Sequence, residues 1–226
     1  MVASLWSSSA RAVVGDPQAG GREVEEPGTG IDLYWLPLGA GGHSVRLNGR
    51  VFEAMVARRE GRPRLDLYHS ALVVHVPPDG RFAIEQGPAG RGDGSARGVV
   101  SGGAVGSRWL GRFRLFRYEL RCWRDGVIAD LAEAVDSPCL LTSDAGSAQR
   151  VLDAAPAVPT AVWGRDELGT GEMWNSNSVI AWLLARCGIA VDSIEPPAGG
   201  RAPGWQAGLA VARREDARTG TGPHEA

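Results

Sequence analysis

The residues with the clearest chemical potential form a short polar segment, Trp174-Asn175-Ser176-Asn177-Ser178. Asparagine occurs only three times in the chain, and two of these asparagines flank Ser176. A serine hydroxyl acts as a nucleophile when a neighbouring base removes its proton. Serine and asparagine are also the preferred caps of a helix N-terminus. The segment therefore predicts either a nucleophile at Ser176 or a structural cap formed by Asn175 or Ser176.

An apolar stripe follows this segment and predicts a helix over residues 176–187. Its members recur at spacings of three and four, and they are Val179, Ile180, Leu183, Leu184 and Cys187. Gly188 stands where a helix commonly ends. The first turn of a helix carries free N–H groups and a partial positive charge. Those groups would stabilise the negative charge that develops when Ser176 attacks a carbonyl group.

His69 is the candidate base, and it lies near the start of the most strand-like stretch, residues 67–76. Strand alternation places His69 on the same face as Ala71 and Val73, and on the opposite face from Ser70. Glu85, on an expected return strand over 81–86, is the carboxylate best placed by the order of the elements to orient His69. The alternatives are a structural histidine at a strand end and a solvated Glu85.

The order of these features resembles the circularly permuted papain-like superfamily. That group includes NlpC-type peptidases, lecithin:retinol acyltransferase-like proteins and PPPDE proteins. In it, a histidine strand, here Tyr68-His69-Ser70-Ala71, precedes a nucleophile helix that typically opens Asn-Cys-Asn-[Ser/Thr]-Phe, here Asn175-Ser176-Asn177-Ser178-Val179. Bacterial families similar to this group also carry Asn-Ser-Asn-[Ser/Thr]. The resemblance covers residues 66–188 and implies a permuted papain-like (NlpC-type) hydrolase or acyltransferase that acts on an amide or ester, peptides included.

The chain departs from that family at its nucleophile, because Ser176 stands where the family has cysteine. A thiol with an ordinary pKa of about 8.5 becomes a thiolate beside a protonated histidine and a helix N-terminus, whereas a hydroxyl does not ionise comparably. Serine chemistry requires a base that takes the proton during attack. Two hypotheses follow, an enzyme with Ser176 as nucleophile and His69 as base, and an inactive binding module that keeps the cleft.

Residues beside these positions are the candidate binding residues. Tyr68, Trp174, Asn175 and Asn177 adjoin the two motifs, and Arg165 belongs to a polar run that could line the mouth of a cleft. A second charged region lies between residues 91 and 124, which contains eight arginines and only two acidic residues. We expect a solvated strand face there, with an anionic ligand as the alternative.

Composition limits the other classes of function. The chain has 226 residues, a formal net charge of −2 and no stretch of about 18 apolar residues, so we expect neither a nucleic-acid partner nor a membrane partner. Its three cysteines form no metal-ligand or disulfide pattern, so we expect no metal and no cofactor. No secretory signal is visible, which predicts a cytoplasmic protein. The resemblance implies that its ligand is a small molecule or a peptide.

The pattern along the chain predicts one α+β domain over residues 31–213, between flexible tails at 1–30 and 214–226. Glycine is abundant, with 32 residues, and favours tight turns in an antiparallel sheet. The stretch 87–106 is expected to have little regular structure. The expected strands are 31–36, 67–76, 81–86, 112–123 and 208–212, with a hairpin over 43–52; the expected helices are 53–60, 145–154 and 176–187.

Overall fold

The protein is built on a twisted, mostly antiparallel sheet flanked by helices. The computed structural model describes residues 28–38, 63–90, 97–128 and 130–220, together with Arg58, Gly61 and Gly94. Within these residues the sheet has seven strands, of which six follow the order β4-β5-β3-β2-β1-β6 and the short β7 pairs in parallel with β2. The strands are β1 Gly30–Pro37, β2 Asp66–Val76, β3 Gly80–Pro88, β4 Val99–Ala104, β5 Arg117–Arg124, β6 Val135–Thr142 and β7 Gly200–Arg201.

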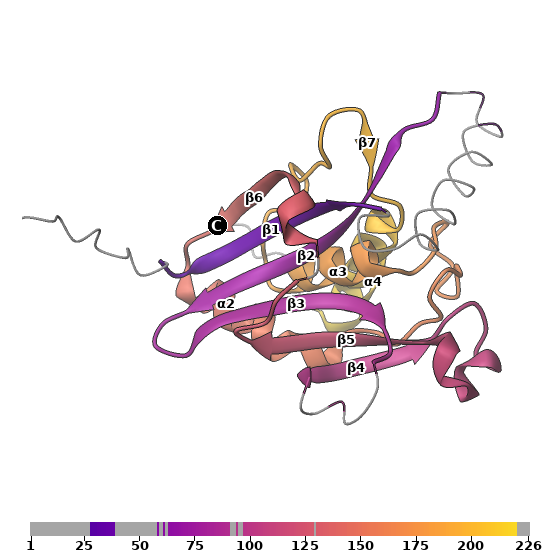
Figure 1. Cartoon of the computed structure of the whole chain (residues 1–226), viewed down its shortest axis with the longest axis horizontal. Coiled ribbons are helices and arrows are strands. Elements are labelled where there is room, and N and C mark those ends of the chain that lie inside the picture. Colours follow the sequence, from indigo (N-terminus) through magenta and orange to yellow (C-terminus); the bar gives the residue numbers. More distant parts are fainter. Residues whose placement is uncertain are drawn as a thin grey trace, which may run out of the picture.

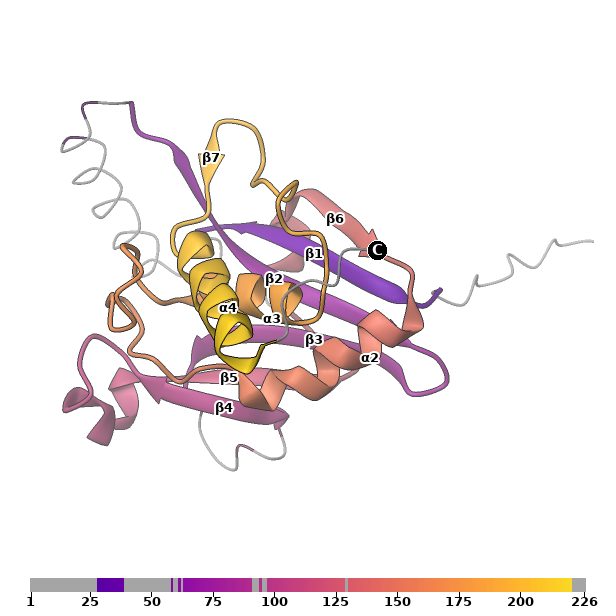
Figure 2. The same cartoon turned by 180° about the vertical axis from the view of Figure 1, so that it is seen from behind.

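Three helices cover one face of this sheet, as Figure 2 shows. They are α2 Ala145–Ala154, α3 Ser176–Arg186 and α4 Trp205–Thr219. The segment that follows β5 crosses the opposite face and includes a short 3-10 turn (Figure 1). The four 3-10 turns of the described chain are η2 Leu110–Arg112, η3 Arg114–Phe116, η4 Leu131–Glu133 and η5 Ala155–Ala157. None of the helices in the described part is long and apolar enough to cross a membrane.

Alternation along β2 sends its side chains into two separate cores. Leu72, Val74 and Val76 belong to the larger core beneath the helices. Ala71 and Val73 belong to a smaller core on the opposite face, which Ile128 helps to close. The central strand is therefore buried on both faces, which explains why its sequence is nearly continuously apolar.

The prediction of an α+β protein with an antiparallel sheet is confirmed. The predicted strands near 31–36, 67–76 and 81–86 correspond to β1, β2 and β3, and the predicted helices over 145–154 and 176–187 correspond to α2 and α3. Asp144 caps α2, where its carboxylate accepts a hydrogen bond from the N–H of Ser147 at 2.6 Å. The expected hairpin over 43–52, the helix over 53–60 except for Arg58, and most of the N-terminal tail lie outside the described residues.

Four expectations are wrong in detail. Residues 208–212 belong to helix α4 and not to a strand, because Leu209 and Ala212 join the apolar face that packs into the main core. The stretch 87–106 contains strand β4, and the strand expected from residue 112 begins only at Arg117, after η2 and η3. The tail expected from residue 214 begins as the last turns of α4, where the Arg214 guanidinium donates to the carbonyl of Leu168 at 2.7 Å.

Close packing between α3 and α4 depends on Gly208. A Cβ atom at this position would lie 2.1 Å from the carbonyl oxygen of Ser178 and 2.9 Å from Cβ of Ala181. The two helices can approach each other here only because α4 has a glycine, which carries no side chain, at the point of contact.

We predict that Gly208→Ala destabilises the protein by about 1–3 kcal/mol, although alanine is intrinsically the better helix former. The physical reason is backbone overlap, which the change in helix propensity does not offset. Urea unfolding measures the effect. Gly146→Ala in α2 is the matched control, because its added Cβ meets only side-chain ends, those of Arg150 and Asp144, and we expect a change below about 1 kcal/mol. Equal stability of Gly208→Ala and the wild type would contradict the packing argument.

Candidate functional site

Helix α3 begins with a complete capping box. The side-chain oxygen of Asn175 accepts hydrogen bonds from the N–H groups of Asn177 at 2.9 Å and Ser178 at 3.3 Å. The Ser178 hydroxyl accepts in return from the N–H of Asn175 at 3.1 Å and donates to the carbonyl of Gly204 at 2.7 Å. The capping role predicted for this segment is therefore confirmed, and it belongs to Asn175.

Asn177 connects this helix to the histidine-bearing strand. Its side-chain oxygen accepts a hydrogen bond from the Ser70 hydroxyl at 2.9 Å, and its amide nitrogen donates to the carbonyls of Tyr68 and Pro203, each at 2.9 Å. Asn177 is 1% exposed and Ser70 is fully buried. Two motifs more than a hundred positions apart in the sequence are thus in direct contact.

The sheet makes room for this contact because β2 and β3 separate. Their paired residues run from Val76 opposite Gly80 to Leu72 opposite Ile84, and no pair forms between the described residues nearer the start of β2. Figure 1 shows the two strands diverging beyond that point, with α3 behind the opening. The carbonyl of Tyr68 therefore has no partner on β3 and accepts the hydrogen bond from Asn177 instead.

Ser176 is the one polar residue of the segment whose side chain is not used in this network. It is the first residue of α3 and is 7% exposed. Among the described residues its hydroxyl makes no hydrogen bond, whereas the side chains of Asn175, Asn177 and Ser178 are all bonded. The Ser176 hydroxyl thus has no hydrogen-bond partner among the described residues, although its neighbours are fixed by theirs. It lies beside the partial positive charge of the helix N-terminus.

His69 lies next to the contact between the motifs but on the other side of β2 from Ser70. The register of β2 against β1 is regular here, with His69 opposite Leu36, so adjacent side chains alternate between the faces. No hydrogen bond joins His69 to Ser176 in the described structure. Burial lowers the pKa of His69 from 6.5 to about 4, against a smaller opposing effect of the Asp130 carboxylate. The imidazole is therefore neutral at pH 7.

Glu85 lies on the same face of the sheet as His69, on the neighbouring strand. It is paired across the sheet with Arg121. Burial is the main effect on Glu85 and raises its pKa. The charge of Arg121 acts against this effect, and the charge of Asp130 adds to it. Glu85 makes no hydrogen bond to His69 within the described residues. Asp130, which precedes η4, is the carboxylate whose charge acts on His69, and the sequence held no signal for it because it is an isolated aspartate in an irregular segment.

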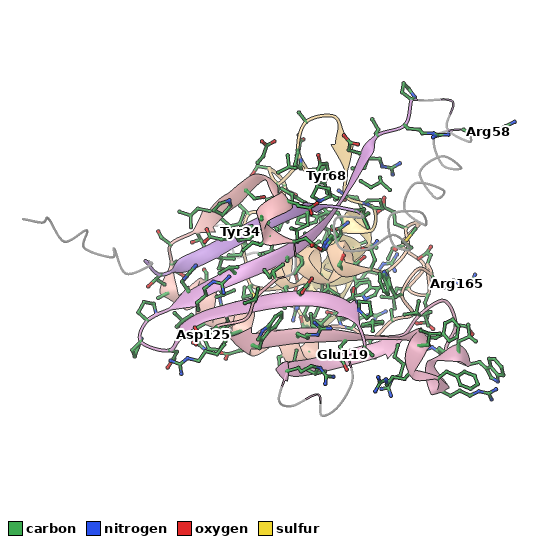
Figure 3. The ribbon with its side chains drawn as sticks, in the orientation of Figure 1. Tyr34, Arg58, Tyr68, Glu119, Asp125 and Arg165 are labelled. Atoms are coloured by element: carbon green, nitrogen blue, oxygen red, sulfur yellow. The ribbon has the colours of Figure 1, made fainter. Side chains whose placement is uncertain are left out.

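The other predicted binding residues separate into buried and exposed ones. Trp174 is 1% exposed and Tyr68 is 7% exposed, and both are part of the main core. Arg165 lies at the surface, away from Tyr68 (Figure 3), and its guanidinium donates to the carbonyl of Gly106 at 2.8 Å. It lines an open pocket of about 450 Å³ together with Gly106, Ser107, Arg108, Val162, Asp166 and Glu167. The pocket is polar, and two of its lining residues, Arg108 and Glu167, form an ion pair.

Neither the thiols of Cys122 and Cys187 nor any cluster of metal ligands forms a reactive site in the described part of the chain. Burial raises the pKa values of Cys122 and Cys187 to about 11, so both remain thiols at neutral pH. No group of three or more His, Cys, Asp or Glu side chains there could hold a metal ion. Comparisons with protein-family models, curated proteins and solved structures give no match to this chain.

We predict that Asn177→Ala and Ser176→Ala differ sharply in stability. Asn177→Ala removes three hydrogen bonds and leaves the buried Ser70 hydroxyl and Tyr68 carbonyl without partners, so it should cost about 2–4 kcal/mol. Ser176→Ala removes no hydrogen bond seen in the described structure and should stay within about 0.5 kcal/mol of the wild type. Urea unfolding of both variants tests this, and similar losses would show that Ser176 also belongs to the structural network.

We predict that stability falls on acidification because of His69. Its pKa is about 4 in the folded protein and 6.5 when unperturbed, so the unfolded chain binds the proton first as the pH drops. The stabilisation is complete above about pH 6.5 and is lost toward pH 4, with about 2 kcal/mol lost between pH 7 and pH 5. His69→Gln should remove that part of the pH dependence of the unfolding free energy. Parallel wild-type and His69→Gln profiles would contradict the assignment.

Proposed function

We propose that this protein is a hydrolase or acyltransferase that acts on an amide or ester, with peptides among its candidate substrates. Ser176 is the nucleophile and His69 is the base. The observation that supports the proposal most strongly is the selective use of the polar segment. Asn175, Asn177 and Ser178 fix the helix start through hydrogen bonds, while the Ser176 hydroxyl between them makes none among the described residues. Such a frame is what a positioned nucleophile requires.

The chemistry follows from the states of these groups. The neutral imidazole of His69 can accept the Ser176 hydroxyl proton as the serine oxygen forms a bond to the substrate carbonyl carbon. The N-terminus of α3 would stabilise the negative charge that develops on the carbonyl oxygen. The protonated imidazole then returns its proton to the leaving amine or alcohol, and water or a second acceptor releases the acyl group. The Asp130 carboxylate would limit the cost of charging His69.

The alternative is a binding module that retains the site without turnover. Two observations favour it. No hydrogen bond joins Ser176 to His69 among the described residues, and an imidazole with a pKa of about 4 is a weak base. In that case the polar segment serves only to cap α3 and to tie it to β2.

Labelling with a fluorophosphonate probe separates the two functions. If the protein is an enzyme, the probe reacts with Ser176 in the wild type, labelling disappears in Ser176→Ala, and it slows about 100-fold or more in His69→Ala. Ser107→Ala, which changes a serine of the pocket beside Arg165, is the matched control and should label normally.

A second variant addresses the case in which the native serine is inert. In Ser176→Cys, the helix N-terminus should make the new thiol react faster with iodoacetamide than the native thiols do, namely the half-buried Cys122, the exposed Cys139 and the buried Cys187. A reactive thiol at position 176 with an unlabelled native serine indicates a binding site. An unreactive thiol together with an unlabelled serine would overturn both proposals and leave only a helix cap.

A further inference from the structure

Exposed apolar side chains are concentrated in one segment that is remote from the helix start of α3 in the sequence. Of the six large hydrophobic residues that are exposed in the described structure, four lie within residues 107–117. Figure 1 shows η2 and η3 projecting beyond the end of the sheet near β4 and β5. We name this surface the aromatic–arginine patch, and it consists of Arg108, Trp109, Arg112, Phe113, Arg114, Leu115, Phe116 and Arg117.

The apolar part of the patch is exposed to an unusual degree. Leu115 is 86% exposed, Trp109 is 61% exposed and Phe113 is 48% exposed. Neither η2 nor η3 contains a buried residue, so the patch does not contribute to the core. Trp109 and Phe113 also contact each other, with ring centroids 6.0 Å apart. A concentration of exposed apolar side chains of this kind marks an interaction site in a folded protein.

The patch is also strongly basic. It carries four arginines and no acidic residue, although the whole chain has a net charge of −2. Arg108 is paired with Glu167. The guanidinium of Arg112 stacks over the rings of Trp109 and Phe113, at 3.7 and 4.7 Å from their centroids. Arg114 and Arg117 are exposed to solvent.

We propose that the aromatic–arginine patch docks on the surface of an anionic lipid bilayer. Tryptophan, phenylalanine and leucine insert at the boundary between headgroups and acyl chains, while arginines bind the lipid phosphates beside them. Long arginine side chains suit this position because their stems lie along apolar surface and their charges reach the headgroups. This contact is peripheral, and it needs no helix that spans the membrane. The proposal differs from the expectation that this arginine-rich region is a solvated strand face and from the expectation that the protein has no membrane partner.

The same residues fit other partners less well. Bases of a single-stranded nucleic acid would need free aromatic faces for stacking, but Arg112 already lies over both Trp109 and Phe113. The most exposed apolar residue, Leu115, is aliphatic and offers no stacking surface. A stable protein interface needs about 800 Å² on each partner, which is large for a projecting segment of eleven residues.

Co-sedimentation with vesicles tests the proposal with the full chain. We expect binding to phosphatidylcholine vesicles that contain phosphatidylserine, much weaker binding to phosphatidylcholine alone, and loss of binding in high salt. Leu115→Asp and Arg114→Glu should each weaken binding about tenfold or more. Both residues are exposed and outside the core, so neither change should alter the urea unfolding curve.

Two matched controls lie outside the patch. Val127 is 80% exposed and Leu140 is 63% exposed, so Val127→Asp and Leu140→Asp introduce the same charge at exposed apolar positions elsewhere. Both should bind vesicles like the wild type. The wild-type tryptophan emission should shift to shorter wavelength on vesicle addition, and Trp109→Phe should abolish that shift because Trp109 is the tryptophan in the patch.

Three results would overturn the proposal. The first is equal vesicle binding by the wild type and the two patch variants, or no binding by any of them. The second is tight binding of single-stranded RNA that Leu115→Asp and Arg114→Glu abolish while vesicle binding is absent, which would make the patch a nucleic-acid surface. The third is a change of molecular mass in ultracentrifugation on Leu115→Asp without vesicle binding, which would make it a contact between copies of the chain.

Discussion

The buried side-chain amide of Asn177 holds together three segments that are far apart in the sequence. It binds the Ser70 hydroxyl and the Tyr68 carbonyl on β2 and the carbonyl of Pro203 before α4. An amide buried without partners would cost about 1–3 kcal/mol, so each of these groups must be present and correctly placed. The separation of β2 from β3 provides the free carbonyl that the amide needs.

The position of α3 follows from that constraint. Asn175 also donates to Pro203, at 2.8 Å, and Ser178 donates to Gly204, so the start of α3 and the start of α4 share one set of hydrogen bonds. Gly204 then adopts a left-handed conformation with φ of 86°, and Gly208 lets the helices come into contact. Because the side chains of Asn175, Asn177 and Ser178 are all hydrogen-bonded, Ser176 is oriented by its neighbours and not by bonds of its own.

The sequence was most informative where local chemistry and tertiary packing agree. The strands β1, β2 and β3 have strong patterns, Asn175 caps α3 as the sequence predicts, and Asp144 caps α2. The apolar run at 208–212 is too short for its pattern to distinguish a strand from a helix. The contact of Leu209 and Ala212 with the core is what favours the helix. Strand β4 has few side-chain signals, since Gly102 and Gly103 lie against Tyr118 on β5. Similarly, the motif pointed to Asn177, but its partner Ser70 emerges only from the three-dimensional arrangement.

The environment of His69 bears on the proposal that the nucleophile is a serine and not a cysteine. A thiolate–imidazolium pair needs a histidine that is protonated at neutral pH, which requires a pKa raised by the thiolate and by solvent. Burial of His69 acts in the opposite direction and keeps the ring neutral. A neutral ring is the form that accepts a proton from a serine hydroxyl. Accepting that proton makes the ring an imidazolium, and the same burial destabilises this charged form. Among the described residues, Asp130 is the only group whose charge offsets this burial, so the proposed serine chemistry would depend on Asp130.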